Sequence, residues 1–277
     1  MRRFSADYLE RTREGMWADS REALADLDLS NRERILDVGC GTGELTRVLA
    51  ADSDAEVVGV DADRRLLDVA SEHVPCVAGD ALRLPFADDS VDLVVCQALL
   101  INLPEPAAAL REFARVSTDL VAAIEPNNAA VSVDSTVDSE VDLESRVREA
   151  YLRGVDTDVA LGERVESLFE EAGIDPISTR QYDHEKRAEP PYSEVSLRSA
   201  KRKASGEGLA DHEAELRRGL DEAANSEATD DATYASLRRA WREMGLEVID
   251  QMQTDDYERV ETVPFTVTVG RVDGDSA

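Results

Sequence analysis

Apolar residues recur along the first half of the chain as short continuous runs that alternate with stretches of helical spacing. The runs cover residues 35–36, 57–58, 91–96 and 120–124. They are short and rich in β-branched residues, as expected of parallel strands that are buried on both faces. The alternation predicts a Rossmann-like α/β core that extends from a first strand at about residues 34–38 to Glu125.

Both ends of the chain add to this core. Residues 5–29 have helical spacing, and beyond Ala129 helices are predicted at about 139–153 and 158–172, with Gly173 as the C-cap of the second. Further helix is predicted within residues 190–243. Strands are predicted at about residues 177–182, 246–252 and 263–269.

The pattern therefore predicts one structural domain with insertions. Residues 1–128 form an N-terminal helix and the core, residues 129–245 are helical insertions around a late strand, and residues 246–277 complete the sheet. We expect a mostly parallel seven-stranded sheet with helices on both faces and an antiparallel C-terminal strand. The insertions are expected to form a lid over the substrate.

Residues 35–43 read ILDVGCGTG, an apolar run followed by alternating glycines and then a helical pattern. Glycines allow positive φ angles and let a ligand approach the backbone, and a helix N-terminus offers free N–H groups. The spacing G-x-G-x-G, two residues after an acid, departs from the dinucleotide fingerprint G-x-G-x-x-G. Asp61 ends the second run, where a carboxylate can accept hydrogen bonds from both ribose hydroxyls, but this acid alone does not separate NAD from S-adenosylmethionine (SAM).

The segments after the second run identify the family. Residues 79–92 contain the pattern GDA…LPF…D.S.D. Together with the glycine turn, it resembles the ubiquinone/menaquinone-biosynthesis-like (type 11) branch of the class I SAM-dependent methyltransferases. The resemblance runs from Ile35 to Asn128 and departs from the family at residues 117–120, where a Lys-Pro-Gly-Gly turn is usual. It also lacks the histidines that the family often carries near Ile101 and Asn102.

The resemblance implies SAM as the cofactor, S-adenosylhomocysteine as the product, and Asp80 and Ala81 at the adenine edge. The residues assigned to the cofactor are Asp37, Gly39, Cys40, Gly41, Gly43, Asp61, Ala62, Asp80, Ala81 and Gln97. In open α/β sheets, ligands bind at the carboxyl ends of the strands. Glu125, just after the fifth strand, is therefore the candidate general base, and Asn127 is a candidate orienting amide.

The composition is strongly acidic, with 60 Asp and Glu against 31 Lys and Arg and a formal net charge of −29. The acids are spread along the whole chain, which favours adaptation to a salt-rich cytoplasm, and hence a halophilic source, over one basic partner. The charge argues against a nucleic acid partner because phosphates would be repelled. One basic cluster, residues 198–203, is either a solvated helix face or an anion site.

Other residue types exclude further classes of function. Cys40, Cys76 and Cys96 form no C-x-x-C pair and are expected to be core thiols, and the three histidines lack metal-ligand spacing. No apolar run is long enough to span a membrane, and the N-terminus lacks a signal peptide pattern, so a cytoplasmic location is expected. The oligomeric state is expected to be a monomer or a homodimer.

These observations predict a SAM-dependent methyltransferase that acts on a small molecule, with the acceptor chosen by residues beyond Ala129. One alternative is an RNA or protein acceptor, which would need a recognition domain that is not visible in the sequence. Another is a SAM-binding protein without catalysis. A nicotinamide-dependent oxidoreductase is disfavoured by the glycine spacing and by the segment around Asp80.

Overall fold

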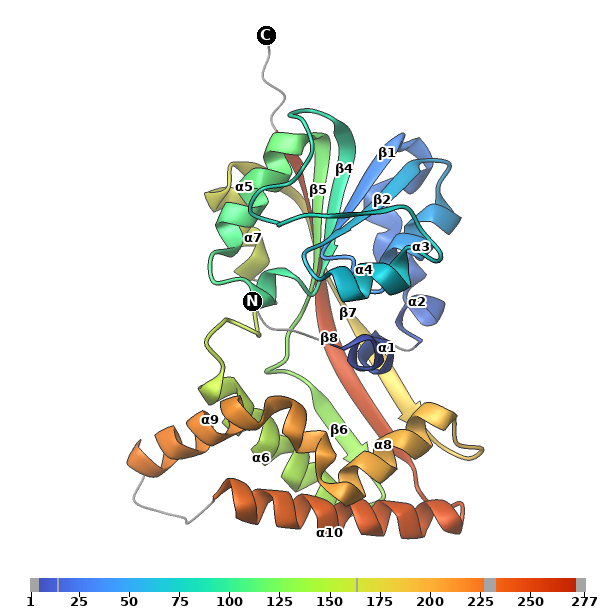
Figure 1. Ribbon diagram of the computed structural model, residues 1–277, viewed down its shortest axis with the longest axis vertical. Coiled ribbons are helices and arrows are strands. Elements are labelled where there is room, and N and C mark those ends of the chain that lie inside the picture. The colour runs from blue at the N-terminus through green and yellow to red at the C-terminus, as the bar shows by residue number, and fades with distance from the viewer. Residues whose placement is uncertain (1–4, 14, 163, 227–232, 273–277) are drawn as a thin grey trace. The chain divides into compact units, whose positions relative to one another are not determined.

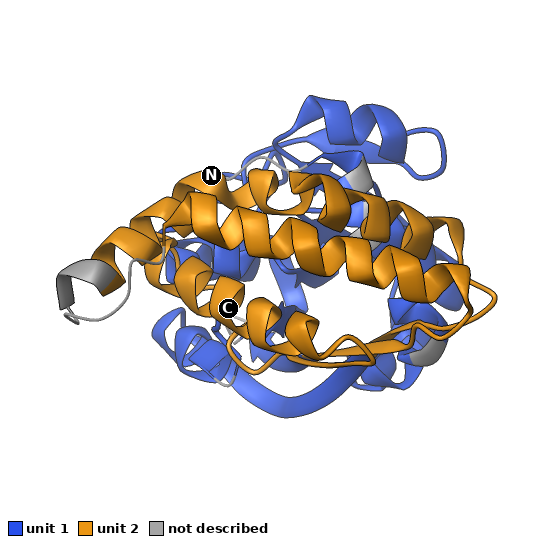
Figure 2. Cartoon of the chain, turned by 90° about the horizontal axis from the view of Figure 1, so that it is seen from below, with its two compact units in different colours: residues 1–127, 160–184, 264–277 blue, residues 128–159, 185–263 orange. Residues whose placement is uncertain are grey.

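The structure is a computed structural model that describes residues 5–13, 15–162, 164–226 and 233–272 (Figure 1). The chain divides into two compact units, coloured separately in Figure 2. Unit 1 consists of Met1–Asn127, Ala160–His184 and Pro264–Ala277, and unit 2 consists of Asn128–Val159 and Glu185–Val263. Two long strands, β7 (Ile174–Ala188) and β8 (Arg259–Val272), contribute residues to both units.

Unit 1 alternates strands and helices, as the hydrophobic pattern predicts. Besides most of β7 and β8, its elements are α1 (Ala6–Arg13), α2 (Met16–Asp19), the 3-10 turns η1 (Arg21–Leu27) and η2 (Leu29–Asn31), β1 (Arg34–Val38), α3 (Glu44–Asp52), β2 (Glu56–Asp61), α4 (Arg64–Ala70), β3 (Cys76–Ala78), β4 (Val91–Gln97), η3 (Leu100–Asn102), α5 (Pro106–Val116), β5 (Ser117–Pro126) and α7 (Arg164–Glu171).

The strands of unit 1 lie in the order β3-β2-β1-β4-β5-β8, and β7 pairs with β8. The first five are parallel, and β8 runs antiparallel to β5. The predicted parallel core with an antiparallel C-terminal strand is therefore confirmed. Because β1, β2, β4 and β5 are parallel, their carboxyl ends meet at one edge of the sheet.

Both faces of this sheet are covered by apolar side chains. Leu36 and Cys96 face the side on which α5 and α7 pack, where Phe113 and Phe169 are fully buried. Neighbouring residues such as Ile35, Leu93 and Val95 face the other side, toward η1 and α3. Successive side chains of a strand point to opposite faces, so these continuous apolar runs are the signature of a sheet that is buried on both sides.

Unit 2 is mainly helical. Its elements are β6 (Ser132–Ser135), α6 (Asp138–Gly154), α8 (Glu194–Ser205), η4 (Glu207–His212), α9 (Glu213–Ser226), α10 (Tyr234–Gln253) and the adjoining ends of β7 and β8. Its core contains the apolar face of α10, including Tyr234, Trp241 and Met244. Helices α6 and α9 cross closely at Gly154 and Gly219. A Cβ atom on either glycine would overlap the backbone of the other helix.

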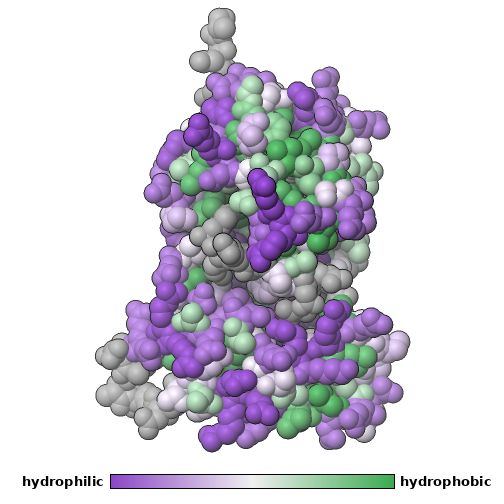
Figure 3. All heavy atoms as spheres, in the orientation of Figure 1, coloured by the Kyte–Doolittle hydropathy of each residue, from purple (hydrophilic) through white to green (hydrophobic). Residues whose placement is uncertain are grey.

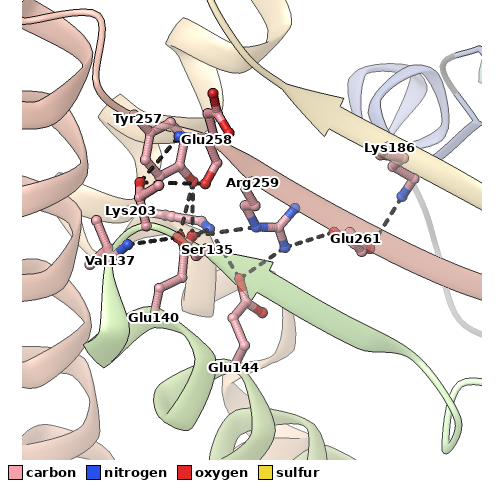
Figure 4. Close-up of polar contacts among 11 residues, drawn as sticks. Ser135, Val137, Glu140, Glu144, Lys186, Lys203, Tyr257, Glu258, Arg259 and Glu261 are labelled. Carbon is pink, nitrogen blue, oxygen red and sulfur yellow. Dashed lines mark hydrogen bonds and ion pairs between the residues drawn. The ribbon is translucent and has the colours of Figure 1, made fainter.

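A network of charged side chains lies in the interior of unit 2 (Figure 4). Its members are Glu140 and Glu144 of α6, Lys203 of α8, Lys186 of β7, and Arg259 and Glu261 of β8. The Glu140 carboxylate is fully buried and also accepts hydrogen bonds from Tyr257 (3.0 Å) and Ser135 (2.5 Å). Three acids therefore face three bases, and the buried charges balance.

The network explains part of the basic cluster that the sequence shows at residues 198–203. Burial opposes ionisation of Glu140, but Lys203 and Arg259 outweigh it and hold its pKa below the usual value. Lys203 forms ion pairs with Glu140 and Glu144, and Arg202 donates to Asp211 at 2.7 Å. Neither side chain is available to form the anion site that was one of two interpretations of this cluster.

Two sequence predictions about the C-terminal region are wrong. The sheet has eight strands rather than seven. The additional strand is β6, which pairs with residues 259–262 of β8, while β5 pairs with residues 265–271. Because β8 has 14 residues, it is long enough to pair with β6 and then with β5 along its length.

The strand predicted at residues 246–252 is instead the end of helix α10. A capping box at Thr233 begins this helix, and Gly245 allows its backbone to lie directly against residues 203–204 of α8. Val248 is buried and Leu246 is 59% exposed, as helical periodicity requires. Tertiary packing thus overrides the β-branched residues 248–249 that suggested a strand.

Hydrophilic residues cover most of the surface that is visible in Figure 3. This agrees with a chain in which 33% of the residues are charged. Among the described residues, no helix is long and apolar enough to cross a membrane.

Candidate functional site

The predicted glycine turn connects β1 to α3 in unit 1. Gly39, Gly41 and Gly43 have φ angles of +74°, +57° and +84°, a region that residues with a Cβ rarely adopt. A Cβ on Gly39 would lie 2.9 Å from a side-chain carbon of Leu99, and one on Gly41 would lie 2.9 Å from Leu9. The turn is therefore bare backbone, enclosed by α1 and by the segment that follows β4.

Asp61 at the end of β2 is tied to this turn. One of its carboxylate oxygens accepts a hydrogen bond from the Gly41 amide at 3.0 Å, and the other accepts from the Asp63 amide at 2.8 Å. Each ionised carboxylate oxygen has two lone pairs, so Asp61 retains acceptor capacity for two hydroxyl groups. This arrangement suits a ribose diol, and the neighbouring Ala62 is exposed.

Asp37 lies beneath the turn rather than on its surface. Its carboxylate is 1% exposed and accepts a hydrogen bond from the Thr46 hydroxyl at 2.6 Å. Burial raises the pKa of Asp37 to about 6, although the Thr46 hydrogen bond and the nearby Arg13 lower it. Asp37 thus joins the end of β1 to the first turns of α3 and fixes the shape of the turn.

Arg13 is a residue of this region that the sequence analysis missed. It lies on α1, its side chain is 10% exposed, and its guanidinium is 3.5 Å from the carboxylate of Glu44 in the first turn of α3. A signal was present, because Arg13 follows the buried Leu9 by four residues and so shares its helix face. Thr46 was also missed, although it is a polar residue on the apolar face of α3.

Asp80 and Ala81 follow β3, as predicted for the adenine edge. One oxygen of Asp80 accepts a hydrogen bond from the Leu82 amide at 3.0 Å. Ala81 is buried, and Asp80 is exposed. The carboxylate is therefore held in place by its own backbone turn and can still meet a ligand.

Cys40 and Cys96 are buried, as predicted for core thiols, whereas Cys76 is partly exposed. Burial raises the pKa of both the Cys40 and the Cys96 thiols, so they stay protonated near neutral pH. All three cysteines are free, and the described residues contain no group of His, Cys, Asp or Glu that could hold a metal ion. Cys40 can accordingly offer a ligand its backbone rather than a thiolate.

Gln97, at the end of β4, carries an unsatisfied polar atom. It is 5% exposed, and its Nε2 contacts the sulfur of Met16 at 3.0 Å, but its Oε1 has no hydrogen-bond partner in the described part of the chain. The indole N–H of the neighbouring residue of α2, Trp17, is likewise buried without a partner. Such buried polar groups are destabilising unless a ligand or water pairs with them, so this strand end is a candidate contact region for a ligand.

Glu125 is fully buried at the end of β5, one strand from Gln97. Its two oxygens accept hydrogen bonds from the amides of Leu99 (3.0 Å), Leu100 (2.8 Å) and Ile101 (3.3 Å). Burial raises the pKa of Glu125 to about 7, against the lowering effect of these amides. Glu125 therefore holds the segment after β4, and this segment places Leu99 against Gly39.

Asn127 follows two residues later. Its amide donates to the Pro264 carbonyl at 2.9 Å, and its side chain packs against Gly162, a glycine with a φ angle of +43°.

Four neighbouring parallel strands carry predicted site residues at their carboxyl ends, namely Asp37, Gly39–Gly43, Asp61, Gln97 and Glu125. Asp80 follows the fifth parallel strand, β3.

This sheet order, the glycine turn and the hydrogen-bonded acid at the end of β2 define a class I SAM-dependent methyltransferase domain. Residues 36–119 match the type 11 family, described as a methyltransferase domain. This match supports the predicted family and cofactor over these residues, which are less than half of the chain.

Curated relatives that match part of this chain are methyltransferases as well. The chain is 38% identical over 104 residues to demethylmenaquinone methyltransferase of Staphylococcus aureus, a match that spans 35% of this chain and 43% of the relative. It is 36% identical over 99 residues to methyltransferase GfsG of Streptomyces halstedii, spanning 32% of this chain and 36% of the relative. The match therefore covers less than half the length of these relatives.

Solved structures support the fold. A candidate methyltransferase from Bacillus halodurans superposes with a TM-score of 0.54 at 17% identity, covering 92% of this chain and 98% of that protein. At this identity the similarity establishes the fold, and the substrate has to be argued from the site.

Proposed function

We propose that the chain transfers the methyl group of SAM to a small-molecule acceptor. The observation that carries the proposal is the link between the Gly41 amide and Asp61, which fixes bare backbone and a carboxylate side by side at the ends of β1 and β2. When bound, SAM would supply a methyl group already activated on a sulfonium. The protein then needs to bind, orient and exclude water rather than create a strong nucleophile.

The residues of the site divide this work. The glycine turn would receive the methionine part of SAM, Asp61 the ribose hydroxyls, and Asp80 with Ala81 the adenine. The unpartnered Oε1 of Gln97 lies at the strand end between these groups and Glu125. A ligand N–H or O–H donor there would satisfy a buried acceptor that otherwise destabilises the site.

Glu125 was predicted as a general base, and that role stays a prediction. Its three amide contacts and complete burial favour a positioning role, because a base must reach the proton that it removes. We propose that Glu125 acts through the segment after β4, by keeping Leu99 against the glycine turn.

The small-molecule acceptor is supported by two observations. The name of the S. aureus relative describes an enzyme that acts on demethylmenaquinone. The net charge of −29 would also repel the phosphates of a nucleic acid. An RNA or protein acceptor and a SAM-binding protein without catalysis remain the competing hypotheses.

Substitution of Asp61 tests the cofactor assignment. Asp61→Ala would leave two ribose hydroxyls without their acceptor, so the affinity for SAM should fall by about 1–3 kcal/mol. Isothermal titration of SAM, S-adenosylhomocysteine and NAD into both proteins measures this. Asp68→Ala, an exposed acid on α4, is the matched control, and an Asp61 variant that binds SAM as tightly as this control would refute the ribose assignment.

Turnover distinguishes the competing acceptors. Incubation with methyl-labelled SAM and separated fractions of a cell extract should place the label in the metabolite fraction. Label in RNA or protein would replace the proposed acceptor class. SAM binding without any transfer would favour the non-catalytic alternative.

The segment after β5 is proposed to choose the acceptor, as the sequence analysis expects of residues 129–245. Because this segment begins directly after the strand that carries Glu125 and Asn127, its first residues start at the ligand end of the sheet. Hydrogen exchange with and without S-adenosylhomocysteine plus acceptor should show protection within residues 129–245. Protection confined to residues 35–100 would contradict a lid.

A further inference from the structure

A polar pocket lies in unit 1 beside helix α7 and strands β7 and β8. Its volume is about 470 Å³, within the range of small-molecule sites. It is lined by Glu166, Ser167 and Glu170 of α7, Thr179 and Gln181 of β7, and Thr266 of β8. The sheet order β1-β4-β5-β8 puts two strands between β8 and the strand that leads into the glycine turn.

The rim of this pocket carries negative charge without a counterion. Glu166 and Glu170 are separated by one helical turn, so their carboxylates are neighbours and repel each other. Neither forms an ion pair with a described residue, and no basic residue lines the pocket. By contrast, Glu171 on the same helix lies 3.9 Å from Arg111.

Two threonines that line the pocket have hydroxyl groups without a hydrogen-bond partner among the described residues. Thr266 is 3% exposed and lines the pocket, and its hydroxyl makes no hydrogen bond to a described residue. The Thr179 hydroxyl is also buried without a partner, as is that of Thr268, two residues along β8. Buried hydroxyls normally find a partner, so the hydroxyls of Thr179 and Thr266 leave hydrogen-bonding capacity for a ligand in this pocket.

The combination selects one class of ligand. Two carboxylates favour a cation, and the hydroxyl and amide oxygens of Thr266, Thr179 and Gln181 can accept N–H donors. No group of three metal-ligating side chains exists among the described residues. We propose that this pocket binds a small protonated amine, whose ammonium group lies between Glu166 and Glu170 and donates to Thr266.

The test uses protein without SAM, so that its outcome is separate from that of the proposed methyl transfer. The probe is 1,4-diaminobutane, titrated calorimetrically in 1 M potassium chloride, where the screening length of ~3 Å suppresses general attraction to an acidic surface. We expect one site per chain and no binding of 1,4-butanediol, which has the same chain length but no charge.

Substitutions identify the site. Glu166→Gln and Glu170→Gln should each weaken binding roughly tenfold or more, because each removes a charge-assisted hydrogen bond. Glu171→Gln, on the same helix but outside the pocket, should bind as the unaltered protein does. Equal binding by all three variants, or no binding by the unaltered protein, would overturn the proposal.

Thr266→Val separates ligand binding from folding. The substitution removes a hydroxyl that makes no hydrogen bond to a described residue and keeps a β-branched residue in the strand, so the melting temperature should stay the same or rise. Binding of 1,4-diaminobutane should nevertheless weaken. A variant that retains full affinity would show that Thr266 does not contact the amine and would contradict the proposed geometry.

Discussion

At the scale of single residues, the site depends on two buried acids whose hydrogen bonds hold the surrounding backbone and side chains in place. Asp37 binds Thr46 and Glu125 binds three consecutive amides. The sequence identifies both as site residues from their position after a strand. It does not reveal their partners, because Thr46 and the amides of residues 99–101 become neighbours only when β1, β4 and β5 align.

The raised pKa of Glu125 predicts a pH dependence of stability. Its pKa is about 7 in the folded state and 4.5 in the absence of structure. Between these values the folded protein holds a proton that the unfolded chain releases, so this contribution to stability is lost as the pH rises from 4.5 to 7. The magnitude is on the order of 3 kcal/mol.

Glu125→Gln isolates this effect because glutamine does not titrate. Urea unfolding at pH 5, 6, 7 and 8 should show the unaltered protein gaining stability relative to the variant as the pH falls. The control Glu72→Gln, at an exposed position, should track the unaltered protein at every pH. A stability difference between the unaltered protein and Glu125→Gln that does not change with pH would contradict the assignment.

At the scale of elements, the predictable parts are those in which local pattern and tertiary context agree. Strands β1 and β4 fall where the apolar runs predict them, because strands buried on both faces require continuous apolar residues. The strand prediction for residues 246–252 is wrong because their local preference for a strand conflicts with the packing of α10 on α8. Strand β6 was not predicted because it has only four residues, of which Val133 alone is apolar, and this is too short for a hydrophobic pattern.

The charged network of unit 2 is an element-scale feature, since it connects α6, α8, β7 and β8. Lys203→Met should reduce the free energy of unfolding by about 3–5 kcal/mol, because it leaves the buried Glu140 without a main counterion. Arg153→Gln, which breaks an exposed pair with Glu149, should change it by less than about 1 kcal/mol. Chemical denaturation followed by circular dichroism compares the two variants, and equal losses would show that the network has no special role.

At the scale of the whole molecule, the dominant quantity is a net charge of −29. Repulsion among surface carboxylates opposes the compact state and is screened by salt. The halophilic interpretation of the composition therefore predicts a melting temperature that rises steadily as potassium chloride increases from millimolar to molar. A melting temperature that does not change over this range would refute that interpretation.

Strand β8 has a consequence for how the protein is made. Residues 264–272 complete the sheet of unit 1, and residues 259–262 pair with β6 in unit 2. A ribosome synthesises residues 259–272 after every strand with which they pair. Since chains begin to fold from the N-terminus during synthesis, β5 and β6 must each wait with an open edge until this last strand emerges. Both units therefore finish folding late, and a nascent chain that stops at residue 258 would leave each of them one strand short.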